Sequence, residues 1–435
     1  MPSILQAPRQ LLRRFAGGAG GAITAQTVAA GGSFLLQVLA ARALGAAGYG
    51  RFVVCVAVLV AVTALQTGWL GDSLAVLDRH VPDVRAALAT CLIASGLLGF
   101  LGGVLVGVAV GLGGWRAPVL LGALLAAWLL EESGRRLLMA RLEFWKLVGN
   151  DLTYLAVALA VLLGCRAAGL QLTVGVFLGA MASGAAAAVL VLLVQVPRSE
   201  LSELRPGLRG MRTVAGFAVW RSAQATLRPA ALLAARLLVL HLVSAAALGR
   251  LESARLLMAP AQTVINGTGA FLLPTFVRAE RERPGTRASR RRRDRRADRA
   301  VVALAAATVV SGLVLLSVLG PLGRLVTGGH FEVSALAVLG WTVYLATWAA
   351  TLPYVSETVA RRLSRDVFRA RLVDSVVGVV LTAAVLIADR DLVAMVPWAL
   401  AIGGAVGALM LRRLAVTTRQ SDAGPVRDLW RVYAG

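Results

Sequence analysis

Charged residues are scarce in this chain, and lysine and histidine are almost absent. Only 15% of the 435 residues are charged, and Lys146 is the single lysine among 45 basic residues. The three histidines His80, His241 and His330 are isolated, and the three cysteines are dispersed through apolar runs. We therefore expect no metal site. So low a charged fraction also excludes an ordinary soluble domain.

Long apolar runs take the place of the missing charge. The hydrophobic fraction is 58% and the mean hydropathy is +0.76. A helix needs about 20 apolar residues to cross a bilayer core. Helices are the expected elements, because the runs lack the alternation of barrel strands and lipid does not tolerate unpaired backbone groups. The candidate spans are twelve in number and lie near 21–41, 52–71, 86–110, 117–134, 149–165, 174–196, 214–241, 251–276, 300–322, 333–354, 369–388 and 392–412.

The basic residues predict the orientation of these spans. If the N-terminus is cytoplasmic, the inward segments hold 34 of the 45 basic residues. This asymmetry favours cytoplasmic N- and C-termini. The run RASRRRRDRRADR at 287–299 suits a topology signal, and it also suits binding to anionic membrane lipids. The net charge of +23 is thereby explained without nucleic acid as a partner.

The chain contains two related halves. Ala43-Leu44-Gly45 matches Ala247-Leu248-Gly249 at an offset of 204 residues, and Arg51 matches Arg255 at the same offset. Both segments follow the first span of a six-span half. Because six is an even number, the two halves insert the same way up, and we expect them to enclose a central cavity. The predicted parts are an N-terminal lobe at 1–196, a cytoplasmic linker at 197–212, a C-terminal lobe at 213–412 with an Arg-rich inward loop at 277–299, and a tail at 413–435. The predicted fold class is an all-α integral membrane protein of about 12 transmembrane helices in two six-helix lobes.

Three segments carry a resemblance to a known family. ARALGAAGYGRF after the first span, EESGRRLLMARLEFWKLVGND between spans four and five, and ALGRLESARLLMAPAQ with LLPTF after span seven resemble the Wzx-type polysaccharide-precursor flippases. These belong to the multidrug/oligosaccharidyl-lipid/polysaccharide exporter (MOP) superfamily. The resemblance covers almost the whole chain. It departs at Gly71-Asp72, where the acidic residue follows the glycine instead of preceding it.

The resemblance implies a function. It implies a flippase that moves a lipid-linked oligosaccharide from the inner to the outer leaflet of a bacterial plasma membrane, for cell-surface polysaccharide biosynthesis. Other polysaccharide-assembly proteins are implied as partners.

The seventh span, FAVWRSAQATLRPAALLAARLLVLH, carries three arginines. At about 100° per residue, Arg228 lies roughly 20° and Arg236 roughly 60° from Arg221, and Gln224 lies about 60° to the other side. Charge at the bilayer centre is costly, so this stripe is expected to face a water-filled cavity or partner helices. Snorkelling toward the interfaces is the alternative for Arg221 and Arg236.

Guanidinium groups in a membrane cavity suit the capture of an anion. Their planar donors match phosphate oxygens bidentately and keep their charge. We therefore predict Arg228 first, then Arg236 and Arg221, as ligands of the diphosphate in a prenyl-diphosphate-linked saccharide. Arg42 and Arg51 flank the loop after the first span, where they either contact the cargo at the outward mouth or anchor helix ends.

Neutral polar groups and aromatic rings are candidates for binding the sugars. Gln262 and Asn266 stand four residues apart on one helical face, which suits a polar cavity wall or hydrogen bonding between helices. Trp341, Tyr344 and Trp348 follow helical spacing, which suits sugar stacking or, more commonly, helix packing.

Carboxylates lie near the inferred cytoplasmic ends of the spans. They are Asp72, Glu131, Asp151, Glu357 and Asp374. The spacings Glu131/Arg135 and Glu357/Arg361 predict i,i+4 ion pairs of the surface type. None is placed at the midplane, so no coupling ion is assigned.

Other functions fit the sequence less well. Asp389-Arg390-Asp391 resembles a glycosyltransferase DxD, but it falls in a predicted turn. No P-loop, HExxH or Ser/His/Asp arrangement is present, so we expect neither a cofactor nor an enzyme such as a multi-span polymerase or ligase. A multidrug antiporter of the same superfamily would favour acidic residues in its cavity. A lipid II flippase would share the prenyl diphosphate cargo, but generally has more spans.

Overall fold

The computed structural model describes residues 18–78, 81–197, 205–268, 272, 287–361 and 363–421, and every regular element in those ranges is helical. The long apolar runs form helices because a helix satisfies its own backbone hydrogen bonds. The named elements are α2 (Gly18–Gln66), the π-helix η1 (Thr67–Gly71), α3 (Asp72–Val76), α4 (Pro82–Ala109), α5 (Arg116–Ala140), α6 (Phe144–Ala167), α7 (Val174–Gln195), α9 (Met211–Leu242), α10 (Ala245–Leu257), α12 (Arg287–Ser317), α13 (Leu319–Thr327), α14 (Ala335–Ala360), α15 (Ser364–Ala388), the 3₁₀-helix η2 (Arg390–Met395) and α16 (Val396–Ser421).

The first helix, α2, contains a bend at Gly45. This residue has φ 64° and ψ 178°, a conformation that glycine adopts without steric cost. With the residues that follow, α2 forms an apolar helical stretch Gly20–Leu74 of 55 residues. At about 1.5 Å per residue it would measure roughly 80 Å, more than twice a bilayer core. It therefore contains the two spans predicted at 21–41 and 52–71, one on each side of Gly45.

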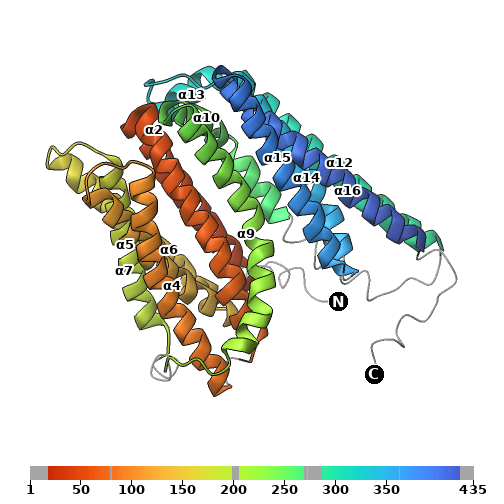
Figure 1. The fold of residues 1–435 in the computed structure, drawn as a ribbon, viewed down its shortest axis with the longest axis horizontal. Coiled ribbons are helices and arrows are strands. Elements are labelled where there is room, and N and C mark those ends of the chain that lie inside the picture. The colour runs from red at the N-terminus through yellow and green to blue at the C-terminus, as the bar shows by residue number, and fades with distance from the viewer. Residues whose placement is uncertain are drawn as a thin grey trace, which may run out of the picture. The chain divides into compact units, whose positions relative to one another are not determined.

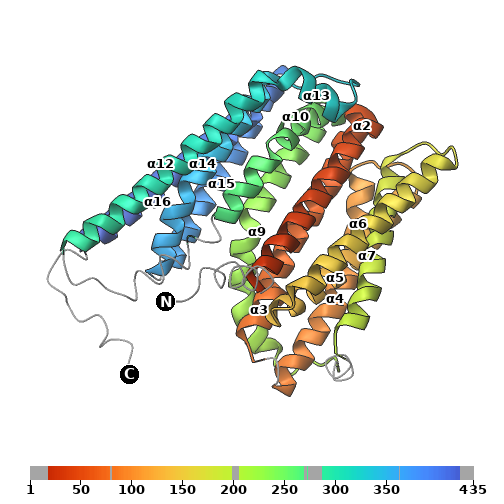
Figure 2. The same cartoon turned by 180° about the vertical axis from the view of Figure 1, so that it is seen from behind.

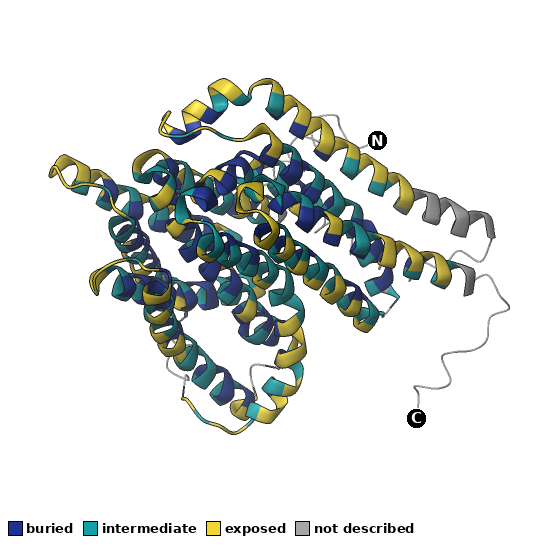
Figure 3. Cartoon of the chain, turned by 45° about the horizontal axis from the view of Figure 1, so that its top comes forward, coloured by how far each residue is buried: buried dark blue, intermediate teal, exposed yellow. Residues whose placement is uncertain are grey.

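Within the described ranges, ten helices are long and apolar enough to cross a membrane. The first contains two predicted spans, and the other nine each match one predicted span. The span predicted at 251–276 lies partly outside the described residues. Large apolar side chains such as Leu105 (70% exposed) and Val194 (87% exposed) are open to the surroundings, as expected for faces that contact lipid. Figure 3 shows exposed positions along many of the helices. The all-α membrane fold is thus confirmed.

The Arg-rich segment at 287–299, predicted as part of an inward loop, belongs instead to a helix. α12 begins at Arg287 and continues to Ser317. Arginine and alanine are good helix formers, so the polar run extends the apolar span by several turns. The rest of that predicted loop, 277–286, lies outside the described residues.

The chain divides into two compact units. Unit 1 is Met1–Leu256 with Arg324–Glu332, and unit 2 is Leu257–Gly323 with Val333–Gly435. The predicted lobes divide at 197–212, whereas in the structure α9 belongs to unit 1, because it packs on α2, η1 and α4. The assignment of lobes from the sequence repeat remains a prediction.

In unit 1, α4 and α5 lie side by side (Figure 1) and pack through small residues. Gly99, Gly103 and Gly107 recur every fourth residue on α4. A methyl group on Gly103 would overlap the backbone of Gly122 on α5, and one on Gly107 would overlap Pro118. Close approach of backbones is a main source of helix association in lipid, where apolar burial gives little driving force.

Close backbone approach at small residues also brings α2 against α10. Ala46 and Gly50 lie one turn apart on α2, and Ala245 and Gly249 lie one turn apart on α10. A methyl group on Gly50 would overlap the carbonyl oxygen of Ala245, and one on Gly249 would overlap that of Ala46. The two helices therefore cross antiparallel at a small-x₃-small contact. This crossing brings together the two segments that the sequence repeat relates.

Unit 2 is built from α12, α14, α15 and α16, seen from behind in Figure 2. α14 packs against both α12 and α16, and α16 also packs against α15. At the α15–α16 contact, a methyl group on Gly403 would overlap the carbonyl oxygen of Asp374. Close backbone approach thus stabilises this unit as well.

Candidate functional site

The predicted arginine stripe lies on α9 in unit 1. α9 is helical throughout, from Met211 to Leu242, including Pro229. Its three arginines have different surroundings, which are described in turn below.

Arg221 is held by two partners while remaining open. Its Nε and Nη2 lie 2.9 and 2.8 Å from Oδ2 of Asp72, and its Nη1 donates to Oε1 of Gln224 at 3.3 Å. The side chain is still 47% exposed. The predicted proximity of Arg221 and Gln224 is therefore confirmed, and Asp72 is identified as the partner of Arg221.

The π-helix η1 brings Asp72 to this position. A π-helix inserts an extra residue into a turn and re-aims the side chains that follow. At its second residue, Gly68, a methyl group would overlap the backbone of Ser222 on α9. Because η1 approaches α9 so closely, Asp72 at the start of α3 reaches Arg221.

Arg228 lies about two turns beyond Arg221 and is half-buried. Pro229 follows it and has no N–H, so the carbonyl of Ala225 lacks its usual helical donor. One backbone carbonyl close to Arg228 therefore lacks a helical hydrogen bond. Its role as the first diphosphate ligand remains a prediction.

Arg236 forms a buried ion pair within the protein. Its Nε and Nη2 donate to Oε1 and Oε2 of Glu252 at 2.8 and 3.2 Å. Arg236 is 9% exposed and Glu252 is 1% exposed. Arg255 donates to the same carboxylate, and its Nη2 lies 3.5 Å from Oε1 of Gln37. We therefore remove Arg236 from the predicted diphosphate ligands, because a bidentate buried carboxylate already occupies its donors.

Arg42 and Arg51 lie on opposite sides of the Gly45 bend, and both are exposed. Arg42 lies near Gly328, which follows α13. Arg51 lines a cavity together with residues of the α4–α5 and α6–α7 loops.

The predicted sugar-binding residues belong to unit 2. Gln262 is half-buried and Asn266 is exposed, both on a helical segment at 259–268. The rings of Trp341 and Tyr344 are buried and pack edge to face at 5.6 Å, while the ring of Trp348 lies 4.3 Å from the guanidinium of Arg371. The aromatic stripe thus serves helix packing, the alternative stated above.

A buried ionic cluster in unit 1 was not predicted. Glu131 accepts a hydrogen bond from Asn150 at 3.0 Å, and Arg135 pairs with Glu132 at 3.3 Å and with Asp151. The predicted surface pair Glu131/Arg135 is therefore wrong, because Arg135 turns to Glu132 and Asp151 and the carboxylates are buried. The sequence signal was present in the Glu-Glu and Arg-Arg pairs of EESGRRL, but their partner on α6 cannot be read from spacing.

The other predicted i,i+4 pair forms in a different environment. Arg361 lies 3.1 Å from Glu357, as predicted, but Glu357 is buried and Arg361 is half-buried, so the pair is not of the surface type. Arg419 from α16 adds a second pair to the same carboxylate at 2.7 Å. This cluster links α14 to α16 within unit 2.

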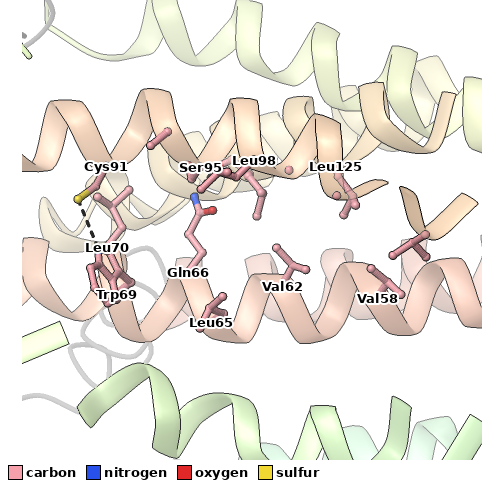
Figure 4. Close-up of a pocket in the computed structure, with 15 residues that line it drawn as sticks. Val58, Val62, Leu65, Gln66, Trp69, Leu70, Cys91, Ser95, Leu98 and Leu125 are labelled. Carbon is pink, nitrogen blue, oxygen red and sulfur yellow. Dashed lines mark hydrogen bonds between the residues drawn. The ribbon is translucent and has the colours of Figure 1, made fainter. Parts of the chain in front are cut away.

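An apolar cavity of about 540 Å³ lies between α2, α4 and α5. Figure 4 shows Gln66 reaching from α2 toward Ser95, and the indole of Trp69 donating to the sulfur of Cys91. Gln66 Nε2 donates to the carbonyl of Leu129 at 2.6 Å. None of the described residues that line this cavity is charged, so the cavity does not suit an anionic group.

Among the described residues, no group of three or more His, Cys, Asp or Glu side chains is placed to hold a metal ion.

Comparison with known proteins relates the fold to a group of transporters. No family model matches the chain, and no curated protein matches its sequence. The structure of the lipid II flippase MurJ in an inward closed conformation matches with a TM-score of 0.71 and 9% identity, covering 95% of this chain and 94% of that chain. An inward-facing multidrug resistance MATE transporter of the MOP superfamily matches with a TM-score of 0.70 and 13% identity, over 91% of this chain and 95% of that chain.

The chain has the fold of MOP superfamily transporters. A further MOP transporter, from Pyrococcus furiosus and described as having a binding pocket of reversed polarity, matches with a TM-score of 0.57 and 11% identity, over 94% of this chain and 96% of that chain. Since structures described as flippases and as multidrug transporters share this MOP fold, the fold alone does not specify the cargo.

Proposed function

We propose that this protein is a flippase that moves a prenyl-diphosphate-linked oligosaccharide from the inner to the outer leaflet of a bacterial plasma membrane by alternating access. Its product would feed cell-surface polysaccharide biosynthesis. The observation that carries the proposal is the exposed guanidinium of Arg221 on α9, which is held by Asp72 of α3 and by Gln224 of α9. An exposed cation in a membrane span requires water or an anionic cargo, because hydrocarbon would not solvate it.

Arg228 and Arg221 are the proposed diphosphate ligands. They lie seven residues apart, so they occupy nearly the same face of α9 about 10 Å apart along its axis. Each guanidinium presents parallel N–H donors that match two phosphate oxygens. Asp72 and Gln224 orient the Arg221 side chain before a ligand binds.

A multidrug antiporter is the second candidate, supported by the TM-score of 0.70 to the MATE transporter. Such a protein would need an acidic cavity for cationic compounds. Glu132 and Asp151, which line a small cavity of unit 1 with Glu131, are paired with Arg135. The exposed guanidinium of Arg221 is the feature that favours an anionic cargo.

The test locates the lipid-linked saccharide in a host that lacks this gene and carries a plasmid-borne copy. Wild type should restore the saccharide to the outer leaflet, and Arg228→Ala should leave it facing the cytoplasm although the protein inserts at normal levels. Arg228→Lys should retain part of the transport, because it keeps the charge but loses the bidentate geometry. Arg166→Ala, which changes an exposed arginine on α6, is the matched control.

Normal transport by Arg228→Ala would refute the assignment of Arg228. Efflux of cationic dyes by the wild type, with no accumulation of saccharide in the deletion strain, would establish the antiporter instead.

A further inference from the structure

A second cavity in unit 1 is lined by two arginines that do not belong to the arginine stripe of α9. Its volume is about 980 Å³, and it lies between the bend of α2, the loop joining α4 to α5 and the loop joining α6 to α7. Arg51 and Arg116 both line it, as does Trp115. These elements bring together side chains that are far apart in the sequence.

The charge of this cavity is of one sign. Among the described residues, no aspartate or glutamate lines it. Arg51 and Arg116 are exposed, and within the part of the chain that the structure describes neither forms an ion pair. The guanidinium of Arg116 lies 5.7 Å from the ring of Trp115, which orients it by a cation–π contact. Arg51 and Arg116 line the same cavity, so an anion bound there would be attracted by both guanidinium groups.

Two helix N-termini add to the positive potential. α5 begins at Arg116 and α7 begins at Val174, and both residues line the cavity. The first turn of each helix carries a partial positive charge and free N–H groups. Thr173 caps the second of these helices, since its hydroxyl accepts from the N–H of Val176 at 3.4 Å.

We call the apolar residues that line the cavity its floor. They include Leu120, Val161, Val176 and Ala180, and Gly179 among them contributes no side chain. A methyl group on Gly179 would meet only Leu120, at 3.6 Å, so there is free space above this glycine. A cationic rim over an apolar floor is complementary to an amphipathic anion.

We propose that this cavity binds a lipid phosphate, with the phosphate between Arg51 and Arg116 and part of the apolar chain against the floor. The phosphate could come from an anionic phospholipid or from the prenyl diphosphate of the cargo. Only the second source rests on the proposed function. Binding in the first case would stabilise this end of unit 1 whatever the protein transports.

Native mass spectrometry of the purified full chain in detergent tests the proposal. Phosphatidylglycerol, phosphatidylcholine and a prenyl diphosphate are added separately, and the fraction of protein that retains each lipid is measured. Wild type should retain an anionic lipid in preference to phosphatidylcholine. The double variant Arg51→Gln/Arg116→Gln should lower that retention roughly tenfold, because it removes charge-assisted hydrogen bonds to phosphate. Arg324→Gln, at an exposed arginine of unit 1 outside the cavity, should leave it unchanged.

A second variant separates binding from misfolding. Gly179→Leu keeps both arginines but fills the floor, so it should also lower retention of the anionic lipid while the melting temperature stays near that of wild type. Retention by wild type of phosphatidylglycerol, of the prenyl diphosphate or of both, lost in both variants, supports the site. Equal retention of charged and zwitterionic lipid by wild type, or unchanged retention in Arg51→Gln/Arg116→Gln, overturns it.

The outcome is independent of the transport assay. If prenyl diphosphate is retained through Arg51 and Arg116, the cavity is a site for the cargo. If only phosphatidylglycerol is retained, the site is a structural lipid site, and the proposed function is still decided by Arg228→Ala.

Discussion

Arg236 on α9 donates two hydrogen bonds to the carboxylate of Glu252 on α10, at 2.8 and 3.2 Å, in a site that is closed to solvent. Sixteen residues separate the two in sequence. Since α9 and α10 are consecutive and Arg255 contacts the same carboxylate, this pair joins α9 to α10 at the small-x₃-small crossing with α2. The cation that looked like a cargo ligand in the sequence is a structural one in the fold.

Removing one member of this pair should destabilise the protein strongly. Glu252→Gln leaves the buried guanidinium of Arg236 without its counter-charge, a change that typically costs about 3–5 kcal/mol. The midpoint of thermal unfolding in detergent should fall clearly. Arg236→Met combined with Glu252→Leu should recover part of the loss, because the buried guanidinium of Arg236 is removed with its carboxylate and only Arg255, which is less buried, loses a partner. Arg250→Met, at an exposed position of α10, is the control. A normal melting midpoint together with lost transport in Arg236→Met would return Arg236 to the cargo site.

Exchanging the charges of Arg221 and Asp72 distinguishes a structural pair from a ligand. The pair is exposed, so breaking it should cost no more than ~1 kcal/mol of stability. Arg221→Asp with Asp72→Arg restores the attraction but moves the cation from α9 to α3. We expect a melting midpoint near that of wild type and a large loss of transport. Full transport by the exchanged variant would show that only the pair matters and that Arg221 does not bind the cargo.

Enlarging a glycine at the helix crossing should separate α2 from α10. Gly249→Leu places a side chain where the carbonyl of Ala46 lies, so the protein should fold poorly or melt at a lower temperature. Gly164→Leu on α6 is the matched control, since no atom lies within 4 Å of the methyl group it would add. Equal melting midpoints for the two variants would contradict the close crossing.

The ionic cluster of unit 1 should depend on Arg135. Arg135→Met leaves the buried carboxylates of Glu132 and Asp151 with less positive charge, and we expect a loss of about 3–5 kcal/mol in the free energy of unfolding. Addition of Asp151→Leu should restore part of it. Additive effects of the two substitutions in a double-mutant cycle would show that the residues do not interact.

Sequence pattern predicted the local features of the fold well. The apolar runs predicted the spans, because the length of a membrane helix is set by the bilayer and its hydrogen bonds are internal. Helical periodicity placed Arg221 and Gln224 on one face of α9, and they are in contact. The charge of the arginine run predicts a loop, but the run forms the first turns of α12, because arginine and alanine have a high helix propensity.

The sequence pattern did not predict which side chains the arginines contact. Whether an arginine in a span faces cargo, a carboxylate or lipid depends on which helix crosses it, and the crossings depend on glycines whose contacts lie far away in sequence. Hydropathy and helical period are local properties, so they predict an all-helical membrane protein with arginines on one stripe. The pairing of Arg236 with Glu252, the pairing of Asp72 with Arg221 and the cavity shared by Arg51 and Arg116 are visible only in the folded chain, because they come from close packing between distant segments.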